Sequence, residues 1–416
     1  MMSFSVRSFG CRANQAEAFA WTEALQKHGF IYEPDYHRAD FLLINTCTVT
    51  SRADADARRF IRKAARENPD LRLIVTGCMV ERIPDRFSSD PRIWRVYTNR
   101  GKEEIVKELI QQTPAASPSG YLPFRSRPPV KIQDGCDYQC SFCIVPSVRG
   151  KSVSAPPDAV IQRVRDLVEQ GFSEVVLTGV HINLYGRDLN PPRTFTSLLR
   201  EMENIAGLEL IRLSSLDPRF MDDEFVDHIT SSSLVCPHFH LSLQHGSDPV
   251  IARMGRKITT ARYSGLLKKI RSGRPDASLG ADMIVGFPGE TKEDFKNMAE
   301  FVRNSPLNYL HVFSYSPRPG TPAARWERVK PETAKQRSVQ LRRLSREKNA
   351  AFRRQFTGRI LDAVVVKKRR SGIEAVTPNY IDVIIPGADI KPGEDIKVRI
   401  LSVENTRVEG RIEDRP

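Results

Sequence analysis

The chain has 416 residues, of which 40% are hydrophobic and 27% charged, a composition typical of a folded water-soluble protein with two or three domains. Its apolar runs, such as Glu174–Val180, have the length of strands, which excludes a membrane-spanning helix and makes a membrane partner unexpected. The net charge of +14 favours a polyanionic partner, with a merely basic surface as the alternative. The first residues, MMSFSVRSFGC, lack an apolar signal core, so we expect a cytoplasmic location.

Residues 1–112 alternate short apolar runs with amphipathic segments, the pattern of a parallel α/β domain. Three of the runs lead into a cysteine: Ser3–Phe9 into Cys11, Phe41–Ile44 into Cys47 and Leu71–Val75 into Cys78. Helical stretches follow at 15–28, 51–67 and about 80–87. Because parallel strands end at one edge of their sheet, the three cysteines should converge into a three-thiolate site. The alternative, small buried residues at strand ends, is less favoured because the placement occurs three times.

A second group of cysteines follows a segment at 113–127 that is rich in Pro, Ser and Ala and is predicted to be a linker. Cys136, Cys140 and Cys143 have the spacing CxxxCxxC directly after a predicted strand. Three thiolates can hold three irons of a four-iron cluster, and no nearby cysteine supplies a fourth ligand. An open iron indicates chemistry on a bound molecule. Cys236 belongs to neither group, and we expect it to be a core thiol.

Residues 128–354 form the predicted central domain. Six strand–helix units in about 200 residues predict a partial (β/α)6 barrel, because a full eight-unit barrel normally needs a longer chain. Turns with small or hydroxyl residues follow several of the strands and would let a nucleotide-like ligand approach the backbone. Thr178, Gly179, Ser215 and Gln244 are therefore candidate cofactor contacts, with ordinary strand-end turns as the alternative reading.

The last third of the chain is basic and then β-rich. A long helix is predicted over 332–356, and residues 325–354 hold 11 Lys and Arg against 3 Asp and Glu, which favours a nucleic-acid surface over a merely solvated helix. Within 355–416, five short β-prone runs predict a small antiparallel barrel of the oligonucleotide-binding kind. Lys367–Arg370 is predicted to lie at a turn, where it would contact phosphates.

CxxxCxxC with an aromatic residue before the last cysteine, here Phe142, resembles the radical S-adenosylmethionine (radical SAM) enzymes. The segments GCRANQAE, NTCTVTSRADADARR, VTGCM, CDYQCSFCIVPSVRG, VVLTGVHINLYG, SLQHGSD, MIVGFPGET and YSPRPGTPA occur in this order and resemble the methylthiotransferase family over nearly the whole chain. The resemblance implies an N-terminal methylthiotransferase domain, a radical SAM partial barrel and a C-terminal β-barrel called TRAM.

The resemblance also implies two [4Fe-4S] clusters and S-adenosylmethionine as cofactors. Cys136, Cys140 and Cys143 would hold the radical-generating cluster, and Cys11, Cys47 and Cys78 the sulfur-handling one. Phe142 would lie at the cofactor together with the strand-end residues named above. The implied partners are the anticodon stem-loop of tRNA, an electron donor of the flavodoxin or ferredoxin type, and a sulfur donor.

The segments NTCTVT and GCxxNxxE, the second of which contains Asn14 and Glu17, resemble those of the family branch that acts on N6-threonylcarbamoyladenosine at tRNA position 37. That branch would form the 2-methylthio derivative with two S-adenosylmethionine molecules per turnover. Two departures are GCRAN in place of GCKVN, and Val153 where an arginine is expected. The alternatives are the same chemistry on isopentenyladenosine in tRNA or on ribosomal protein S12, and a non-catalytic iron–sulfur RNA-binding protein.

Overall fold

The computed structural model describes residues 2–111 and 126–413, so residues 113–125 of the predicted linker lie outside the described residues. Within those ranges, none of the helices combines the length and the apolar character needed to cross a bilayer. The chain divides into two compact units. The first contains the described parts of 1–124, with 134–153 and 316–324; the second contains the described parts of 125–133, 154–315 and 325–416. The predicted domain limits at 112, 128 and 355 stay predictions.

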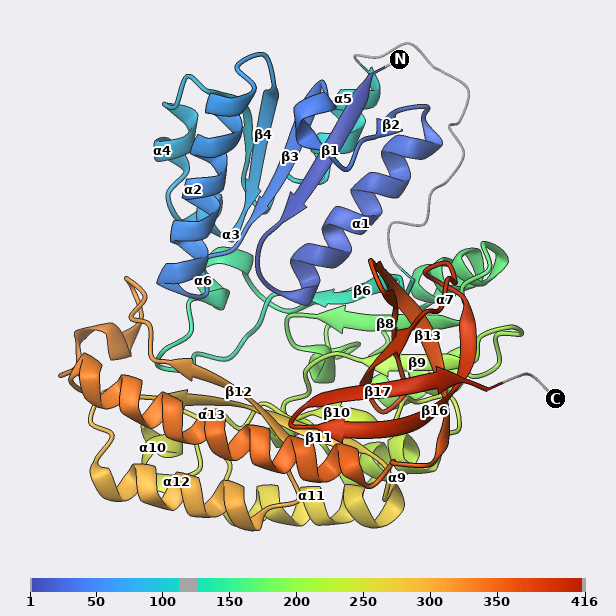
Figure 1. The fold of residues 1–416 in the computed structure, drawn as a ribbon. Helices are drawn as coiled ribbons and strands as arrows, with labels where there is room; N and C mark the ends of the chain where they lie inside the picture. The colour runs from blue at the N-terminus through green and yellow to red at the C-terminus, as the bar shows by residue number, and fades with distance from the viewer. Residues whose placement is uncertain (1, 112–125, 414–416) are drawn as a thin grey trace. The chain divides into compact units, whose positions relative to one another are not determined.

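The first unit is built on a parallel five-stranded sheet of order β2-β1-β3-β4-β5 (Figure 1). Its strands are β1 (Ser3–Ser8), β2 (Ile31–Tyr32), β3 (Phe41–Thr46), β4 (Arg72–Gly77) and β5 (Ile93–Tyr97). Its helices are α1 (Arg12–Lys27), α2 (Ser51–Glu67), α3 (Cys78–Arg82), α4 (Pro84–Ser88), α5 (Glu104–Gln111) and α6 (Val145–Arg149). The predicted parallel α/β domain is thereby confirmed.

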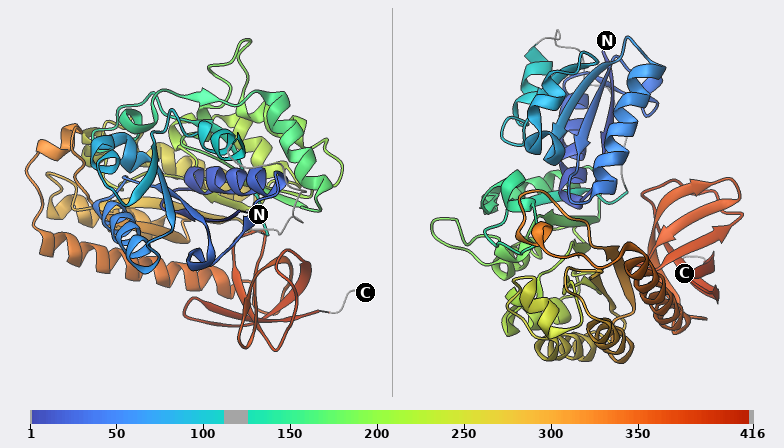
Figure 2. Two further views of the ribbon diagram at one scale, coloured as in Figure 1. Left: turned by 90° about the horizontal axis from the view of Figure 1, so that it is seen from above. Right: turned by 90° about the vertical axis from the view of Figure 1, so that its left-hand side faces the viewer.

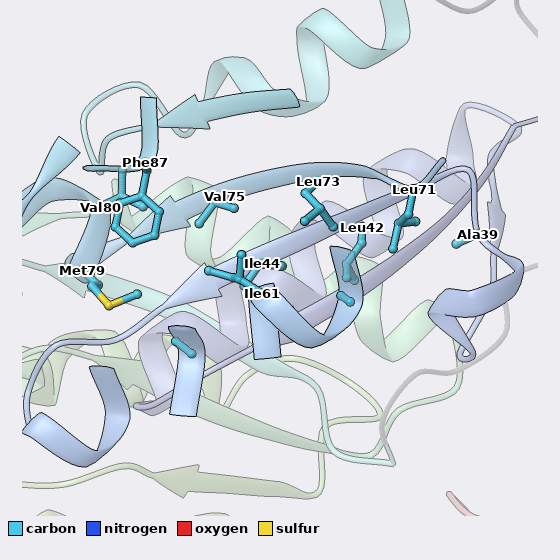
Figure 3. Packing of buried hydrophobic residues seen from close by; sticks show 12 residues of the cluster. Ala39, Leu42, Ile44, Ile61, Leu71, Leu73, Val75, Met79, Val80 and Phe87 are labelled. Carbon is cyan, nitrogen blue, oxygen red and sulfur yellow. The ribbon is translucent and has the colours of Figure 1, made fainter. Parts of the chain in front are cut away.

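Two hydrophobic clusters hold helices against opposite faces of this sheet. Every residue of the central strand β3 is buried, which requires apolar side chains on both of its faces. Leu42 and Ile44 pack with Ile61 of α2 on one face, in the cluster drawn in Figure 3. Phe41 and Leu43 pack with α1 and α5 on the other face. The first unit is therefore a three-layer α/β fold, with its cysteines at the carboxyl edge of the middle layer.

The second unit contains the predicted partial barrel. The strands lie in two sheets, β7-β6-β8-β9 and β10-β11-β12, and isolated bridges such as Leu216↔Leu241 connect them. The strands β6, β8 and β9 run parallel in the first sheet, and all three strands run parallel in the second. The strands are β6 (Pro129–Asp134), β7 (Val153–Ser154), β8 (Glu174–Gly179), β9 (Leu210–Leu213), β10 (His238–His240), β11 (Ser278–Val285) and β12 (Tyr309–Ser314). The six-strand prediction holds, and the two-residue β7 is an addition at the edge.

Helices follow these strands and cover the barrel from outside. They are α7 (Pro157–Glu169), α8 (Phe195–Met202), α9 (Asp223–Ser231), α10 (Asp248–Arg253), α11 (Thr260–Gly273), α12 (Lys292–Asn304) and α13 (Pro331–Arg354). The α12 helix begins with a capping box, in which Thr291 and Asp294 satisfy each other's backbone N–H groups. The α13 helix packs along β12, and Figure 2 shows it running to the C-terminal barrel.

The C-terminal barrel closes in the order β13-β14-β15-β17-β16. Its strands are β13 (Ile360–Arg369), β14 (Gly372–Val376), β15 (Asp382–Pro386), β16 (Asp395–Glu404) and β17 (Arg407–Ile412). Four of its pairs are antiparallel as predicted, whereas β15 and β17 pair in parallel. A ring with an odd number of strands cannot alternate direction throughout, so one parallel pair is required for closure.

Three local predictions need correction. The helix predicted at about 80–87 is two short helices, α3 and α4, because Pro84 cannot continue the first one. Of Lys367–Arg370, only Arg370 lies in the turn, because β13 continues to Arg369. Residues 93–111 form β5 and α5, which the sequence interpretation did not place.

Candidate functional site

Adjacent strands bring the first three cysteines together. Ser8 of β1 pairs with Asn45 of β3, and Asn45 pairs with Thr76 of β4, so the three strands end in register. Cys11, Cys47 and Cys78 come one to three residues later. The strand order places this edge at a topological switch point between β1 and β3, where open α/β sheets bind their ligands. The predicted convergence at one edge is therefore confirmed by the register.

Cys47 and Cys78 are buried, whereas Cys11 is exposed. Gly10 has a φ of +99°, and a Cβ built on it would lie 2.3 Å from Cβ of Cys47, so no larger residue fits there. Burial, together with the neighbouring Cys11 and Cys78, raises the pKa of the Cys47 thiol to about 12. Desolvation also raises the pKa of Cys11, although Arg149 opposes it.

The second cysteine group lies on a loop whose base is fixed by backbone hydrogen bonds. The N–H of Cys136 donates to Gly150 O at 3.0 Å, and that of Cys143 donates to Cys140 O at 3.0 Å. At Gly135 φ is +72°, and an added Cβ would lie 1.9 Å from Lys151 O. Glycine is thus required where the chain enters the cysteine loop.

Arg149, at the end of α6, joins the second cysteine loop to the first cysteine group. Its Nε donates to Cys78 Sγ at 3.3 Å, and its Nη2 donates to Asn14 Oδ1 at 2.6 Å. Asn14 in turn donates through Nδ2 to Phe9 O and Thr46 O, tying the ends of β1 and β3 to the same arginine. One buried side chain therefore contacts the carboxyl ends of all three strands, directly at Cys78 and through Asn14 at the ends of β1 and β3.

The charge of Arg149 is balanced inside the first unit. Its Nη1 lies 2.7 Å from Asp134 Oδ1 and 3.0 Å from Glu17 Oε1, and the side chain is only 2% exposed. Lys102 pairs with both carboxylates as well. Burial alone would lower the pKa of Arg149, but Glu17, Cys78 and Asp134 hold it well above its usual range. The guanidinium is therefore permanently charged beside a cysteine sulfur.

Both cysteine groups fit iron–sulfur clusters by the chemistry of their donors. Each group offers three thiols and no carboxylate in the ligand positions, a set that suits iron in [4Fe-4S] form with one iron open. Cys11, Cys47 and Cys78 are free thiols. Cys78 also packs against Ile144 and Val148, an apolar wall that limits access of water.

Arg318, within the YSPRPGTPA segment, has a structural role that the sequence interpretation did not assign. Its Nη1 donates to Asp54 Oδ2 at 3.0 Å and to Thr48 O at 2.9 Å. Arg82 donates to the same Asp54 oxygen at 2.8 Å. Segment 316–324 is thereby fixed at the start of α2, directly after Cys47. Only tertiary packing reveals this role, and the same holds for Arg149 and Lys102.

The predicted cofactor contacts of the second unit all lie at carboxyl ends of strands. Thr178 and Gly179 end β8, and Ser215 follows β9. Gln244, after β10, adopts a φ of +80° and bridges to Met283 of β11. The buried Thr178 hydroxyl makes no hydrogen bond to the described residues. These positions suit ligand contact, and the assignment of these four residues and of Phe142 to the cofactor stays a prediction.

Cys236 is fully buried, and burial raises the pKa of its thiol to about 12. It lies beside the ion pair of Arg212 and Glu174, away from any second cysteine among the described residues of its unit. The prediction of a core thiol is confirmed.

The sheet with its cysteine edge, the cysteine loop and the six-strand partial barrel define an iron–sulfur protein with a radical SAM fold. The profile of the "Radical SAM superfamily" matches residues 130–302, and that of the "Uncharacterized protein family UPF0004" matches residues 3–97. Among solved structures, the radical S-adenosylmethionine methyltransferase TsrM from Kitasatospora setae, with cobalamin and a [4Fe-4S] cluster bound, aligns with a TM-score of 0.55. That alignment covers 77% of this chain and 76% of TsrM at 15% identity, so it supports the fold alone.

Curated relatives extend the match to nearly the whole chain. The threonylcarbamoyladenosine tRNA methylthiotransferase MtaB of Rickettsia prowazekii is 35% identical over 390 residues, covering 90% of each chain. The enzyme of the same name from Thermotoga maritima is 30% identical and covers 100% of each. The tRNA-2-methylthio-N(6)-dimethylallyladenosine synthase of Parafrankia sp. is 34% identical, covering 88% of this chain and 78% of its own. The chain therefore belongs to the radical SAM methylthiotransferase family.

Proposed function

We propose that this enzyme converts N6-threonylcarbamoyladenosine at position 37 of tRNA to its 2-methylthio derivative, with two [4Fe-4S] clusters and two S-adenosylmethionine molecules per turnover. The observation that carries the proposal is the presence of two three-cysteine groups in one compact unit, bridged by Arg149. Four relatives of 30 to 35% identity that carry the threonylcarbamoyladenosine name support the choice of substrate.

The residues of the chain have distinct tasks in this scheme. Cys136, Cys140 and Cys143 would hold one cluster, and Cys11, Cys47 and Cys78 the other. When bound, the clusters and S-adenosylmethionine supply the radical that removes an unactivated aromatic hydrogen and the sulfur that replaces it. Arg149 holds the two cysteine segments in fixed relation and keeps a positive charge beside Cys78.

A basic pocket on the second unit supports tRNA as the partner. It has a volume of about 570 Å³ and is lined by Arg343, Arg346, Glu347, Ala350, Arg354 and Asn405. Other cations of α13 serve the fold: Arg337 binds the buried Glu290, Arg342 donates to Val312 O, and Lys348 donates to Ser305 O. The pocket face is therefore the part of the basic helix that we assign to the nucleic acid, while Arg337 is buried and Arg342 and Lys348 donate to backbone carbonyls.

Analysis of tRNA nucleosides by mass spectrometry tests the proposal. A strain lacking the gene should lose 2-methylthio-N6-threonylcarbamoyladenosine and keep its unmodified precursor, and the wild-type gene should restore the product. A second candidate, the dimethylallyladenosine substrate, is favoured by the relatives that carry that name. Loss of the 2-methylthio-isopentenyl nucleoside in place of the threonylcarbamoyl product would select it. If neither nucleoside changed while ribosomal protein S12 lost its methylthio group, the assignment to tRNA would be wrong.

A further inference from the structure

The inner face of the β10-β11-β12 sheet carries three titratable side chains that the proposed reaction does not use. His240 pairs in register with Gly280, and Asp282, two residues further along β11, pairs with His311. Since residues i and i+2 of a strand share a face, all three side chains lie on one side of the sheet. Parallel strands covered on both faces normally carry apolar residues, because an ionisable group there costs free energy unless it is compensated.

The ligand atoms of the three residues converge. Nε2 of His240 lies 3.0 Å from Asp282 Oδ1, and Nδ1 of His311 lies 3.5 Å from the same oxygen. All three atoms lie within 4.8 Å of one another. A tetrahedral divalent ion with bonds of about 2.0–2.2 Å to nitrogen and oxygen separates its ligand atoms by about 3.3–3.6 Å. The separation of 3.5 Å matches that geometry, and the separation of 3.0 Å is slightly shorter than it.

The contact between His240 and Asp282 is close but is not a hydrogen bond. Nε2 of His240 is buried and makes no hydrogen bond to the described residues, although the carboxylate oxygen is at 3.0 Å. A separation of 3.0 Å is short enough for a hydrogen bond, so the angle must be unfavourable. The carboxylate oxygen therefore lies off the axis of the ring N–H bond. A metal ion next to both atoms accounts for their approach, because each then directs its lone pair at the ion.

The outer partners of His240 are compatible with the tautomer that a metal ligand needs. Its Nδ1 lies 3.0 Å from the Tyr309 hydroxyl, which is 2.8 Å from Nε2 of His238. We assign the proton to Nδ1 of His240, donating to Tyr309, whose hydroxyl then donates to His238. This assignment leaves Nε2 with a lone pair, and a metal-binding histidine is commonly oriented in this way through its other nitrogen.

The site is also accessible. His240 is buried, Asp282 is partly buried, and the His311 side chain is 57% exposed. The His311 ring stacks on His240 with centroids 4.6 Å apart, and its exposed side leaves a path by which an ion can enter. We propose that His240, Asp282 and His311 bind one divalent transition-metal ion of the zinc type. Two imidazoles and one carboxylate leave at least one coordination position for water or an anionic oxygen ligand.

The test uses the full-length protein with its iron loaded anaerobically, equilibrated with one equivalent of Zn²⁺ and desalted. Wild type should retain about one zinc per chain by mass spectrometry of the metals. X-ray absorption at the zinc edge should show only nitrogen and oxygen neighbours at about 2.0–2.2 Å. Zinc retention should be lost in Asp282→Asn and in His311→Gln, with iron content unchanged. His228→Gln, which alters a histidine–carboxylate pair elsewhere in the second unit, is the matched control and should retain zinc.

A further variant probes the outer partner without removing a ligand. Tyr309→Phe should weaken zinc binding about 10- to 100-fold, because His240 loses the acceptor that orients its ring. Absence of zinc from the wild type would overturn the proposal, as would sulfur neighbours at about 2.3 Å, which would place the metal on cysteine. Equal zinc in wild type, Asp282→Asn and His311→Gln would overturn it too, since the contact would then be an ion pair only. None of these results depends on the identity of the RNA substrate.

Discussion

The guanidinium of Arg149 donates a hydrogen bond from Nε to the sulfur of Cys78 across 3.3 Å. Arg149 follows Cys143 by six residues, whereas Cys78 belongs to the other cysteine group. Hydrogen bonds to ligating sulfur and nearby positive charge both stabilise the more negative, reduced form of an iron–sulfur cluster. This single contact therefore makes the electronic properties of one site depend on the loop that carries the other.

The substitution Arg149→Met should shift the reduction potential of the cluster proposed at Cys11, Cys47 and Cys78 to a more negative value. Removing the guanidinium also takes one cation from the buried Glu17 and the partly buried Asp134, which should cost about 3–5 kcal/mol of stability. A redox titration followed by electron paramagnetic resonance measures the potential, and urea unfolding measures the stability.

The double variant Arg149→Met/Asp134→Asn separates these two effects. It restores the balance of charge, so part of the stability should return while the potential stays shifted. If the potential returned together with the stability, Arg149 would act only by supporting the fold. An unshifted potential in Arg149→Met would contradict the role assigned to the contact.

The sheet and the first cysteine group could be predicted from sequence because their signals are local. Apolar runs mark β1, β3 and β4, and in each the cysteine follows the run, so parallel pairing alone brings Cys11, Cys47 and Cys78 to one edge. Arg149 and Arg318 could not be predicted in the same way. Their partners lie 71 and 264 residues away in the chain, at Cys78 and Asp54, and no periodic pattern connects such pairs.

The same limit applies to the second unit. Alternation on β10, β11 and β12 indicates which residues share a face, but strand register decides that Asp282 meets His311. Likewise, one-sided charge on α13 indicated a nucleic-acid surface, whereas the fold uses Arg337 and Lys348 internally. Local composition cannot distinguish a cation that faces solvent from one that neutralises a buried carboxylate or caps backbone carbonyls.

Gly135→Ala should prevent the second cysteine loop from forming. The added methyl group would overlap Lys151 O, and φ is +72°. Iron content after anaerobic reconstitution should fall by about half, because one of the two cysteine groups is lost. Gly150→Ala is the control: its φ is +75° with nothing within 4 Å of the added Cβ, so it should cost only about 1–2 kcal/mol. Equal iron loss in both variants would show that backbone conformation, and not the overlap, is decisive.

Asp54→Ala should destabilise the first unit by about 3–5 kcal/mol. Its carboxylate is buried and binds both Arg82 and Arg318, which would be left as buried cations without their counter-ion. Urea unfolding measures the change. Asp56→Ala, two residues along the same helix, removes only an exposed pair with Arg52 and should cost under about 1 kcal/mol. A similar cost for both would mean that the Asp54 network adds little to stability.

Substitution in the two cysteine groups should have different consequences. Cys140→Ala should abolish formation of 5′-deoxyadenosine, because the site that cleaves S-adenosylmethionine is lost. Cys47→Ala should abolish methylthio transfer while leaving some uncoupled cleavage of the cofactor. Chromatography of deoxyadenosine and of the modified nucleoside in the same reaction measures both. Full product formation by Cys47→Ala would refute the division of labour between the two groups.

Arg346→Gln should weaken binding of the tRNA anticodon stem-loop and lower its salt dependence. Arg346 lines the basic pocket and is exposed, so it is available to a phosphate. Loss of one phosphate contact should reduce the slope of log K against log salt by about 1, because one fewer counter-ion is released. Fluorescence anisotropy from low to moderate salt measures the slope.

Arg343→Gln serves as a comparison variant. Glu347 already pairs with Arg343 at 2.9 Å, so Arg343→Gln should reduce the slope less than Arg346→Gln does. An unchanged slope in Arg346→Gln would remove this pocket from the RNA surface and leave the exposed cations elsewhere on the chain to account for binding.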